Sequence, residues 1–256
     1  MTDNWASERV ALVTGATSGF GEAMARRLLA AGAHVIATGR RADRLQALSA
    51  DLASERLLTR VLDVREQASI DAMLADLPAP FDAIDILFNN AGLALGLSKA
   101  HEADLDQWQT MIDTNVSGLV RVTRAVLPGM VVRNRGDVIN MSSVAASYPY
   151  PGGNVYGATK AFVRQFSLNL RADLLGTKIR VTSIEPGMAD TEFSVVRFNG
   201  DQASADRVYQ GVHAMSADDV ALVCEGVLKL PAHININSLE LMPVQQAFGP
   251  FAVNRD

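Results

Sequence analysis

The sequence predicts an α/β protein with a doubly wound, seven-stranded parallel sheet, organised as a single domain over residues 1–256. Short apolar runs rich in β-branched residues alternate along the whole chain with longer stretches of helical period. The first run leads into a glycine-rich turn and then a helical pattern, which is the order of a βαβ unit. No repeat, low-complexity linker or change of composition divides the 256 residues.

The expected strands share apolar, β-branched composition and end in glycine, proline or polar residues. In chain order they are Arg9–Thr14, His34–Thr38, Leu58–Leu62, Ile84–Phe88, Asp137–Met141, Lys178–Ile184 and Ser238–Met242. Helical patterns fill the intervals between them. The last helix is expected to begin at Ser216, a capping residue followed by two acids, and to run to Lys229.

Composition excludes several classes of function. Charged residues make up 20% of the chain and the net charge is −5, which disfavours nucleic acid or an anionic membrane surface as the main partner. The single cysteine, Cys224, rules out an intramolecular disulfide and a cysteine metal site, so we expect it to be buried and expect no metal. The N-terminal MTDNWASER lacks a secretion signal, and a soluble cytoplasmic protein is expected.

The turn after the first strand carries the first candidate binding site. Gly15, Gly19 and Gly21 allow a tight turn and close approach of the backbone to a ligand. The following helix N-terminus would point its free N–H groups at phosphate. Thr17, Ser18 and Phe20 complete this expected dinucleotide site.

The end of the second strand indicates which dinucleotide binds. An acidic residue here would bind the ribose 2′-hydroxyl of NAD, whereas this chain has Gly39 followed by Arg40 and Arg41. Guanidinium groups match a 2′-phosphate, so the pattern favours NADP. The alternative is that both arginines start a solvated helix, as Arg44 does.

Polar and small residues also follow the third and fourth strands. Because ligands lie at the carboxyl ends of parallel strands, Asp63 and Val64 are expected to contact the adenine, and Asn90, Ala91 and Gly92 to line the cofactor wall. Asn and Gly also form ordinary turns, and Asp63 could be a structural cap.

The helical stretch Asp104–Arg133 contains Asn115 and Gly118, which are poor residues for a helix interior. We expect a local distortion that frees a carbonyl or holds a water near Asn115. The alternative is a kink without chemistry.

The segment from Met141 to Phe166 places Ser143, Tyr156 and Lys160 at useful spacings. Tyr156 and Lys160 are four residues apart on one helix, so a positive charge is expected to lower the tyrosine pKa. Such pairs also occur by chance on solvated helices. A row of apolar residues on the same helix is expected to face the core: Ala158, Phe162, Phe166, Leu170 and Leu174.

After the sixth strand, Pro186 and Gly187 shape a loop that could cover a nicotinamide, with the Thr191 hydroxyl near its amide. Residues 190–215 have an irregular pattern and are expected to form a substrate lid.

Together these motifs resemble the short-chain dehydrogenase/reductase family over essentially the full length of the chain. The resemblance implies a Rossmann fold, NAD(P) as cofactor, and homotetramers or homodimers. It implies that Tyr156 is the acid/base, that Lys160 lowers its pKa and holds the nicotinamide ribose, and that Ser143 polarises the substrate oxygen. Asn115 would hold a water that connects Lys160 to solvent.

Within the family, the chain is similar to NADP-dependent 3-hydroxy acid dehydrogenases and to sulfoacetaldehyde reductases. Both act on short anionic substrates, and Arg197 in the expected lid is the candidate anchor for the anion, with Tyr150 and Tyr209 as hydrogen-bonding wall residues. A salt bridge from Arg197 to Glu192 or Asp201 is the structural alternative. Competing functions are reduction of larger neutral or carrier-bound carbonyls, and a non-catalytic NADP-sensing regulator.

Overall fold

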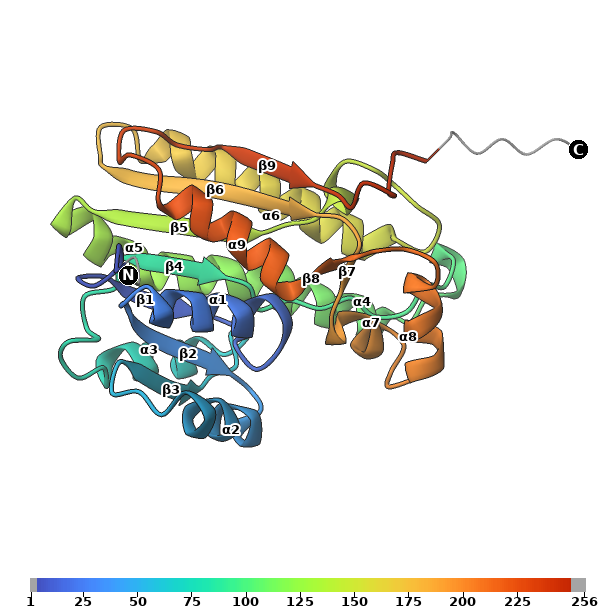
Figure 1. The fold of residues 1–256 in the computed structure, drawn as a ribbon. Helices are drawn as coiled ribbons and strands as arrows, with labels where there is room; N and C mark the ends of the chain where they lie inside the picture. Colours follow the sequence, from blue (N-terminus) through green and yellow to red (C-terminus); the bar gives the residue numbers. More distant parts are fainter. Residues whose placement is uncertain (1–3, 250–256) are drawn as a thin grey trace, which may run out of the picture.

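A computed structural model describes residues 4–249 and contains a seven-stranded, fully parallel sheet in the order β3-β2-β1-β4-β5-β6-β9 (Figure 1). The predicted fold class is confirmed. The strands are β1 (Val10–Val13), β2 (His34–Gly39), β3 (Leu57–Val61), β4 (Ile86–Asn89), β5 (Gly136–Met141), β6 (Ile179–Pro186) and β9 (Ser238–Leu241). Their ends differ from the predicted ones by at most two residues, the usual uncertainty of element boundaries.

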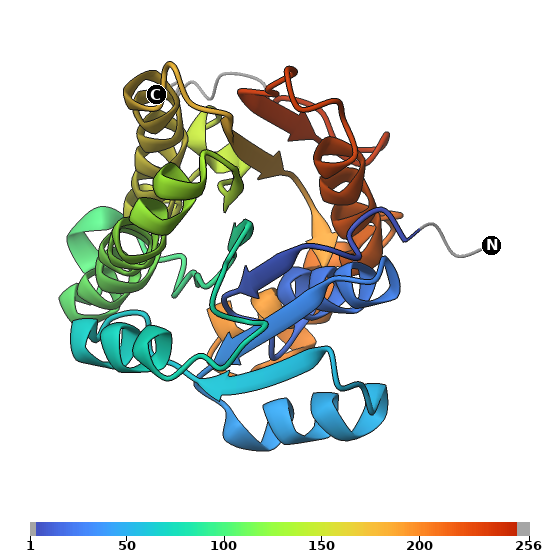
Figure 2. The same cartoon turned by 90° about the vertical axis from the view of Figure 1, so that its left-hand side faces the viewer.

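Helices cover both faces of the sheet (Figure 2). One face packs against α1 (Gly19–Ala30), α2 (Ala42–Leu52) and α9 (Ala217–Leu228), and the other against α3 (Gln67–Ala75), α5 (Leu119–Arg133) and α6 (Asn154–Asp173). Because both faces are covered, all four residues of β1 are buried, which explains its continuous apolar sequence. The chain order reverses between β1 and β4, and ligands bind at such a switch point in open α/β sheets.

The predicted apolar row on α6 is wrong for Ala158 and Phe162, which are exposed, and correct for Leu170 and Leu174, which are buried. Phe162 is 39% exposed and stacks on Phe166, whereas the buried positions of the helix include Tyr156, Lys160 and Val163. A row in steps of four residues rotates by about 40° per step around a helix with 3.6 residues per turn. The row therefore starts in solvent at Ala158 and reaches the core only near its far end.

The predicted distortion near Asn115 is confirmed. A π-helical turn, Asp113–Gly118, joins α4 (Leu105–Ile112) to α5. Single π turns inside helices commonly mark functional sites, because they displace side chains from the regular helical register.

A separate unit follows β6. It contains β7 (Ala189–Asp190), α7 (Glu192–Arg197), α8 (Gln202–Tyr209) and β8 (Met215–Ser216), and β7 and β8 pair in parallel. Two residues per strand leave no periodicity to detect, so the sequence analysis missed both. The predicted cap of α9 is confirmed as a reciprocal capping box between Ser216 and Asp219. Short 3₁₀ turns lie at Ala100–Glu102 and Val144–Ala146.

Cys224 is fully buried in the core between α9 and the sheet, and burial raises its thiol pKa to about 12. The prediction of a packing role is confirmed. Between Asn4 and Gly249, no helix is long and apolar enough to cross a membrane, and no group of His, Cys, Asp and Glu is placed to hold a metal ion.

Candidate active site

A cleft of about 330 Å³ opens over the carboxyl ends of the strands around the switch point. The predicted cofactor residues, except Gly21, line this cleft together with Ser143: Gly15, Thr17, Ser18, Gly19, Phe20, Arg40, Arg41, Asp63, Val64, Asn90, Ala91, Gly92, Tyr156, Lys160, Pro186, Gly187 and Thr191. The predicted residues Asn115, Tyr150 and Arg197 lie behind or beside this lining. Parallel strands that end at one edge bring residues far apart in sequence to a single site.

The glycine turn lies at one end of the cleft. Gly15 and Gly19 have φ values of +66° and +54°, a conformation that residues with a side chain rarely adopt. A Cβ on Gly21 would lie 2.3 Å from the carbonyl oxygen of Gly15, so only a glycine fits against the turn at this position. The Asn90 side-chain amide donates to the carbonyls of Thr14 and Gly15, at 3.1 Å each, and holds the turn in place.

The two arginines after β2 have different surroundings. Arg40 is exposed, its side chain has no hydrogen-bond partner within residues 4–249, and its charge helps to lower the Asp63 pKa. Arg41 donates to Thr17 Oγ1 (2.9 Å from Nη2) and Ser18 Oγ (2.8 Å), and forms an ion pair with Glu192 (2.9 Å). The Arg40 guanidinium is therefore available to an anion in the cleft, while Arg41 is already engaged.

The wall near β3 contains Asp63, whose pKa is lowered chiefly by hydrogen bonds from Arg65. Thr114 lines the same cleft from the π-helical turn. Its Oγ1 is buried and has no hydrogen-bond partner among the described residues. A buried, unpaired hydroxyl at a cleft wall costs free energy until a ligand or water bonds to it. Thr114 could not be predicted, because nothing in the sequence indicates which turn of the helix faces the cleft.

Tyr156 and Lys160 lie on the buried face of α6, 9% and 6% exposed. Burial raises the Tyr156 pKa to about 12, although the Arg197 charge and the neighbouring Ser143 hydroxyl act to lower it. Burial also lowers the Lys160 pKa to about 8. The prediction that Lys160 depresses the tyrosine pKa is contradicted, because desolvation outweighs nearby charge and the Lys160 ammonium bonds to the Met141 carbonyl at 2.8 Å.

Ser143 follows β5 and is 8% exposed. Its hydroxyl donates to the Pro186 carbonyl (3.3 Å) and accepts from the Ala145 amide (3.1 Å), which begins a 3₁₀ turn. The hydroxyl is thereby placed beside the Tyr156 phenol, on the side of the cleft formed by β5 and β6.

The Asn115 side chain makes three hydrogen bonds within the protein. It accepts from the Leu93 amide and donates to the Leu93 carbonyl and to Thr159 Oγ1, at 2.8–3.0 Å. A Cβ on Gly92 would lie 3.2 Å from Asn115 Oδ1 and 3.5 Å from Lys160 Nζ. A glycine at this position therefore lets Asn115 and Lys160 approach one another, without a direct bond between them.

Arg197, the last residue of α7, reaches back over the face of α6 that carries Tyr156. Its guanidinium carbon lies 5.1 Å from the centre of the Tyr156 ring and 5.3 Å from that of Phe193, and it donates to the Tyr150 hydroxyl at 3.0 Å. The Arg197 Nε atom is buried without a partner within the described residues. The alternative salt bridges are absent there: Glu192 pairs with Arg41 and Arg44, and Asp201 bonds to Ser204.

Two further expected residues have structural contacts. Thr191 caps α7 by accepting from the Phe193 amide, and Tyr209 bonds to Ser194 and to the Ala189 carbonyl. Tyr209 thus fastens α8 to α7 and β7 instead of lining the cleft. Cleft residues that the sequence analysis did not single out as contacts are Gly39, Leu62, Leu93, Thr114, Met141, Ser142, Ala189, Glu192, Phe193 and Val196.

Comparisons with known proteins agree with this geometry. The model of the short chain dehydrogenase family matches residues 9–201. The chain therefore belongs to the short-chain dehydrogenase family and is an oxidoreductase of CH–OH groups.

Individual relatives are similar over nearly the whole chain. It is 59% identical to the NADP-dependent 3-hydroxy acid dehydrogenase YdfG of Salmonella typhi, over 96% of this chain and 99% of that protein. It is 56% identical to serine 3-dehydrogenase of Rhizobium radiobacter, with coverage of 96% and 98%. The closed form of serine dehydrogenase complexed with NADP+ has a TM-score of 0.95 at 58% identity, with coverage of 96% and 100%.

Proposed function

We propose that this protein is an NADP-dependent dehydrogenase that interconverts a short anionic hydroxy compound and its aldehyde or ketone. The observation that carries the substrate class is Arg197. A guanidinium without a carboxylate partner lies over the ring of the candidate acid/base and retains an unpaired, buried N–H. A substrate carboxylate or sulfonate beside Tyr156 would satisfy this group.

The cofactor is NADP, and the residues of the cleft fit it. The glycine turn lines the cleft at the N-terminus of α1, where free backbone N–H groups would hold the pyrophosphate, and Arg40 offers a guanidinium without a hydrogen-bond partner to the 2′-phosphate. The unpaired Thr114 hydroxyl lies on the same wall. When bound, this cofactor supplies or accepts a hydride.

Residues of α6 and of the segments packed against it carry out the proton transfer. Tyr156, protonated at neutral pH in this geometry, gives a proton to the substrate oxygen during reduction and takes one during oxidation. Ser143 orients and polarises that oxygen. Lys160 is placed to bond the nicotinamide ribose, and Asn115 supports the adjacent wall and a water that connects Lys160 to solvent.

Residues 190–215 act as a lid on a single domain spanning 1–256. The β7–β8 pair closes the base of this segment, and the backbone amide of Gly96 bonds to the Arg197 carbonyl across the cleft mouth. The lid thus delivers Arg197 to the active site, and the high TM-score to a closed, NADP-bound relative supports a closed arrangement here. A homotetramer or homodimer is the expected assembly.

Relatives described as 3-hydroxy acid and serine dehydrogenases support a carboxylate substrate. A sulfonate presents the same charge and three oxygens to Arg197, so sulfoacetaldehyde and its alcohol, isethionate, are included in the proposal.

Parallel assays of NADPH oxidation test the substrate class. Malonic semialdehyde, succinic semialdehyde and sulfoacetaldehyde are compared with propanal, a neutral aldehyde of similar length. We expect one of the short anions to have the highest kcat/KM. Preference for propanal or for larger neutral ketones would overturn the anionic assignment, and no hydride transfer to any substrate would favour a sensing role.

A further inference from the structure

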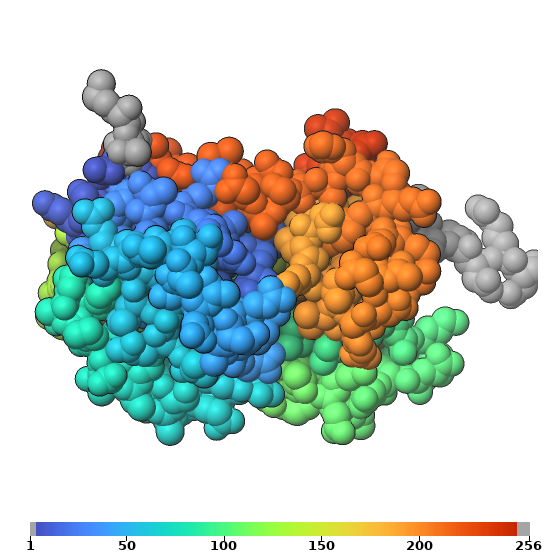
Figure 3. Space-filling model, turned by 60° about the horizontal axis from the view of Figure 1, so that its bottom comes forward, coloured from blue at the N-terminus to red at the C-terminus, as the bar shows by residue number. Residues whose placement is uncertain are grey.

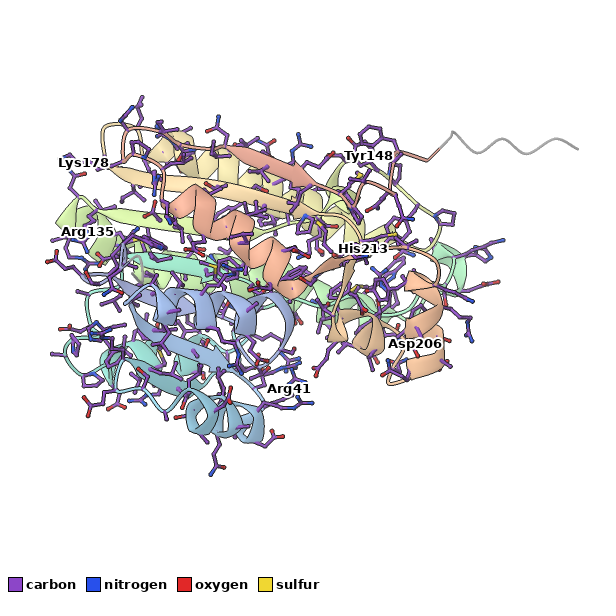
Figure 4. The ribbon with its side chains drawn as sticks, viewed as in Figure 1. Arg41, Arg135, Tyr148, Lys178, Asp206 and His213 are labelled. Atoms are coloured by element: carbon purple, nitrogen blue, oxygen red, sulfur yellow. The ribbon has the colours of Figure 1, made fainter. Side chains whose placement is uncertain are left out.

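The carboxylate of Glu192 connects the lid to the opposite bank of the cleft. Glu192 is the first residue of α7, and its Oε2 lies 2.9 Å from Arg41 Nη1 while its Oε1 lies 3.3 Å from Arg44 Nη2. Both arginines lie at the start of α2, on the βαβ half of the molecule. Figure 4 shows Arg41 at the end of α2 that is nearest α7.

The same arginine is held to the glycine turn. Arg41 donates to Thr17 and Ser18, the residues immediately before Gly19. On the other side, the Thr191 side chain packs over Gly19, 3.5 Å from the position that a Cβ would occupy. In Figure 3 the blue surface of the N-terminal part adjoins the orange surface of the lid. Glycine turn, Arg41 and lid helix therefore form one continuous contact.

This contact crosses the cofactor cleft. The cleft is lined by all four residues of this contact, Ser18, Arg41, Thr191 and Glu192. A dinucleotide bound along the glycine turn would therefore lie beneath the Arg41–Glu192 ion pair. We infer that the ion pair of Glu192 with Arg41 and Arg44 is a latch that holds the lid over bound NADP, and that Glu192 is a positioning residue for cofactor retention. The Arg41 hydrogen bond also lowers the Glu192 pKa, so the latch stays ionised across the neutral range.

Simple electrostatics predicts that removal of the Glu192 carboxylate would tighten NADP binding, whereas a latch predicts that it would weaken NADP retention. NADP carries several negative charges, and a glutamate in the same cleft repels them. Without a latch, Glu192→Gln would therefore tighten cofactor binding. With a latch, the same change opens the lid and releases the cofactor faster, so the sign of the effect separates the two explanations.

The experiment measures dissociation of NADPH by stopped-flow fluorescence, with excess NADP+ as the chase. We expect Glu192→Gln to accelerate dissociation about three- to tenfold, the effect of losing two partly exposed ion pairs that share one carboxylate. Added salt is expected to accelerate release more from the wild type than from the variant, because only the wild type has a latch to screen. Unchanged or slower dissociation from the variant would overturn the proposal.

Asp51→Asn is the matched control. Asp51 pairs with Arg26 at 2.6 Å, with side-chain exposures of 61% and 38%, compared with 39% and 41% for Glu192 and Arg41. It lies at the far end of α2, away from the lid, and should leave the dissociation rate unchanged. An equal acceleration in this control would show a general loss of stability and overturn the latch.

Adenosine 2′,5′-bisphosphate provides the second measurement, since it fills only the adenosine end of the cleft. A latch acts on the full dinucleotide, so Glu192→Gln should leave the bisphosphate affinity unchanged or slightly tighter. If the variant weakens both ligands by the same factor, Glu192 merely orients Arg41 for the 2′-phosphate, and the latch is wrong.

Discussion

Lys160 and Tyr156 share one face of α6, yet the Lys160 ammonium donates to the Met141 carbonyl and lies 5.7 Å from the centre of the Tyr156 ring. The cation nearer to that ring is Arg197, at 5.1 Å. Burial therefore has the largest effect on the Tyr156 pKa and raises it, while the charge of Arg197 in the lid acts to lower it. At neutral pH the phenol is protonated, which is the form that can donate to a carbonyl oxygen.

Replacement of Tyr156 with Phe is expected to lower kcat about a hundred- to ten-thousandfold, the range for loss of a positioned general acid. The change removes only the hydroxyl, so NADPH affinity should stay within about twofold of wild type. Steady-state kinetics with the best anionic aldehyde and a fluorescence titration with NADPH measure the two quantities. Turnover within tenfold of wild type would exclude Tyr156 as the acid.

Replacement of Lys160 with Met should stabilise the cofactor-free protein at pH 7 while abolishing activity. Burial lowers the Lys160 pKa from 10.5 to about 8. Below pH 8 the folded protein therefore holds a charged ammonium group in a site that is shielded from water, which destabilises the fold. Allowing for the lost bond to Met141, we expect a gain on the order of 1–2 kcal/mol in the free energy of unfolding.

The pH dependence gives this prediction its sign. Between about pH 8 and 10.5 the unfolded state binds more protons at Lys160 than the native state, so this residue makes the wild type more stable as pH rises. The advantage of Lys160→Met should shrink across the same window. Urea denaturation at pH 7 and pH 10 measures it; a variant that is less stable at pH 7 would contradict the prediction.

NADPH affinity is expected to fall as pH rises through about 8. The Lys160 ammonium, which we place at the nicotinamide ribose, loses its proton there, whereas the arginines stay charged. Titrations from pH 7 to 9.5 should show the decrease in the wild type and a flat profile in Lys160→Met. Parallel profiles in the two proteins would exclude Lys160 as the titrating group.

Replacement of Arg197 with Ala should raise KM for anionic aldehydes about ten- to a hundredfold, the value of a charged hydrogen bond, and change KM for propanal little. Arg197→Lys keeps the charge without the planar guanidinium, so its KM for anionic aldehydes should lie between those of the wild type and of Arg197→Ala. Equal effects on charged and neutral substrates would contradict the anchor role.

Replacement of Arg40 with Ala should weaken NADP binding about ten- to a hundredfold and leave NAD binding unchanged, because only NADP carries a 2′-phosphate. The ratio of the two dissociation constants reports the effect. Arg44→Ala, in the first turn of α2 and paired with Glu192, is the control that should leave this ratio unchanged.

Local patterns predicted much of this molecule. The glycine turn, the strands buried on both faces, the cap of α9 and the distortion at Asn115 each depend on a few neighbouring residues whose backbone preferences point one way. Membership of the family followed from motifs in a fixed order. The cleft then forms because parallel strands end together, a property that the sheet topology already contains.

Other features required the folded chain. The direction of the shift in the Tyr156 pKa depends on how much water is excluded around α6. The spacing of residues in the sequence does not indicate how much water is excluded. The partners of Arg41 and Arg197 come from segments up to 151 residues away. The sequence by itself determined which chemical groups are present and at which strand ends they emerge. Tertiary structure decided which of them meet, and burial decided their charge, because solvation and long-range contact are properties of the packed chain.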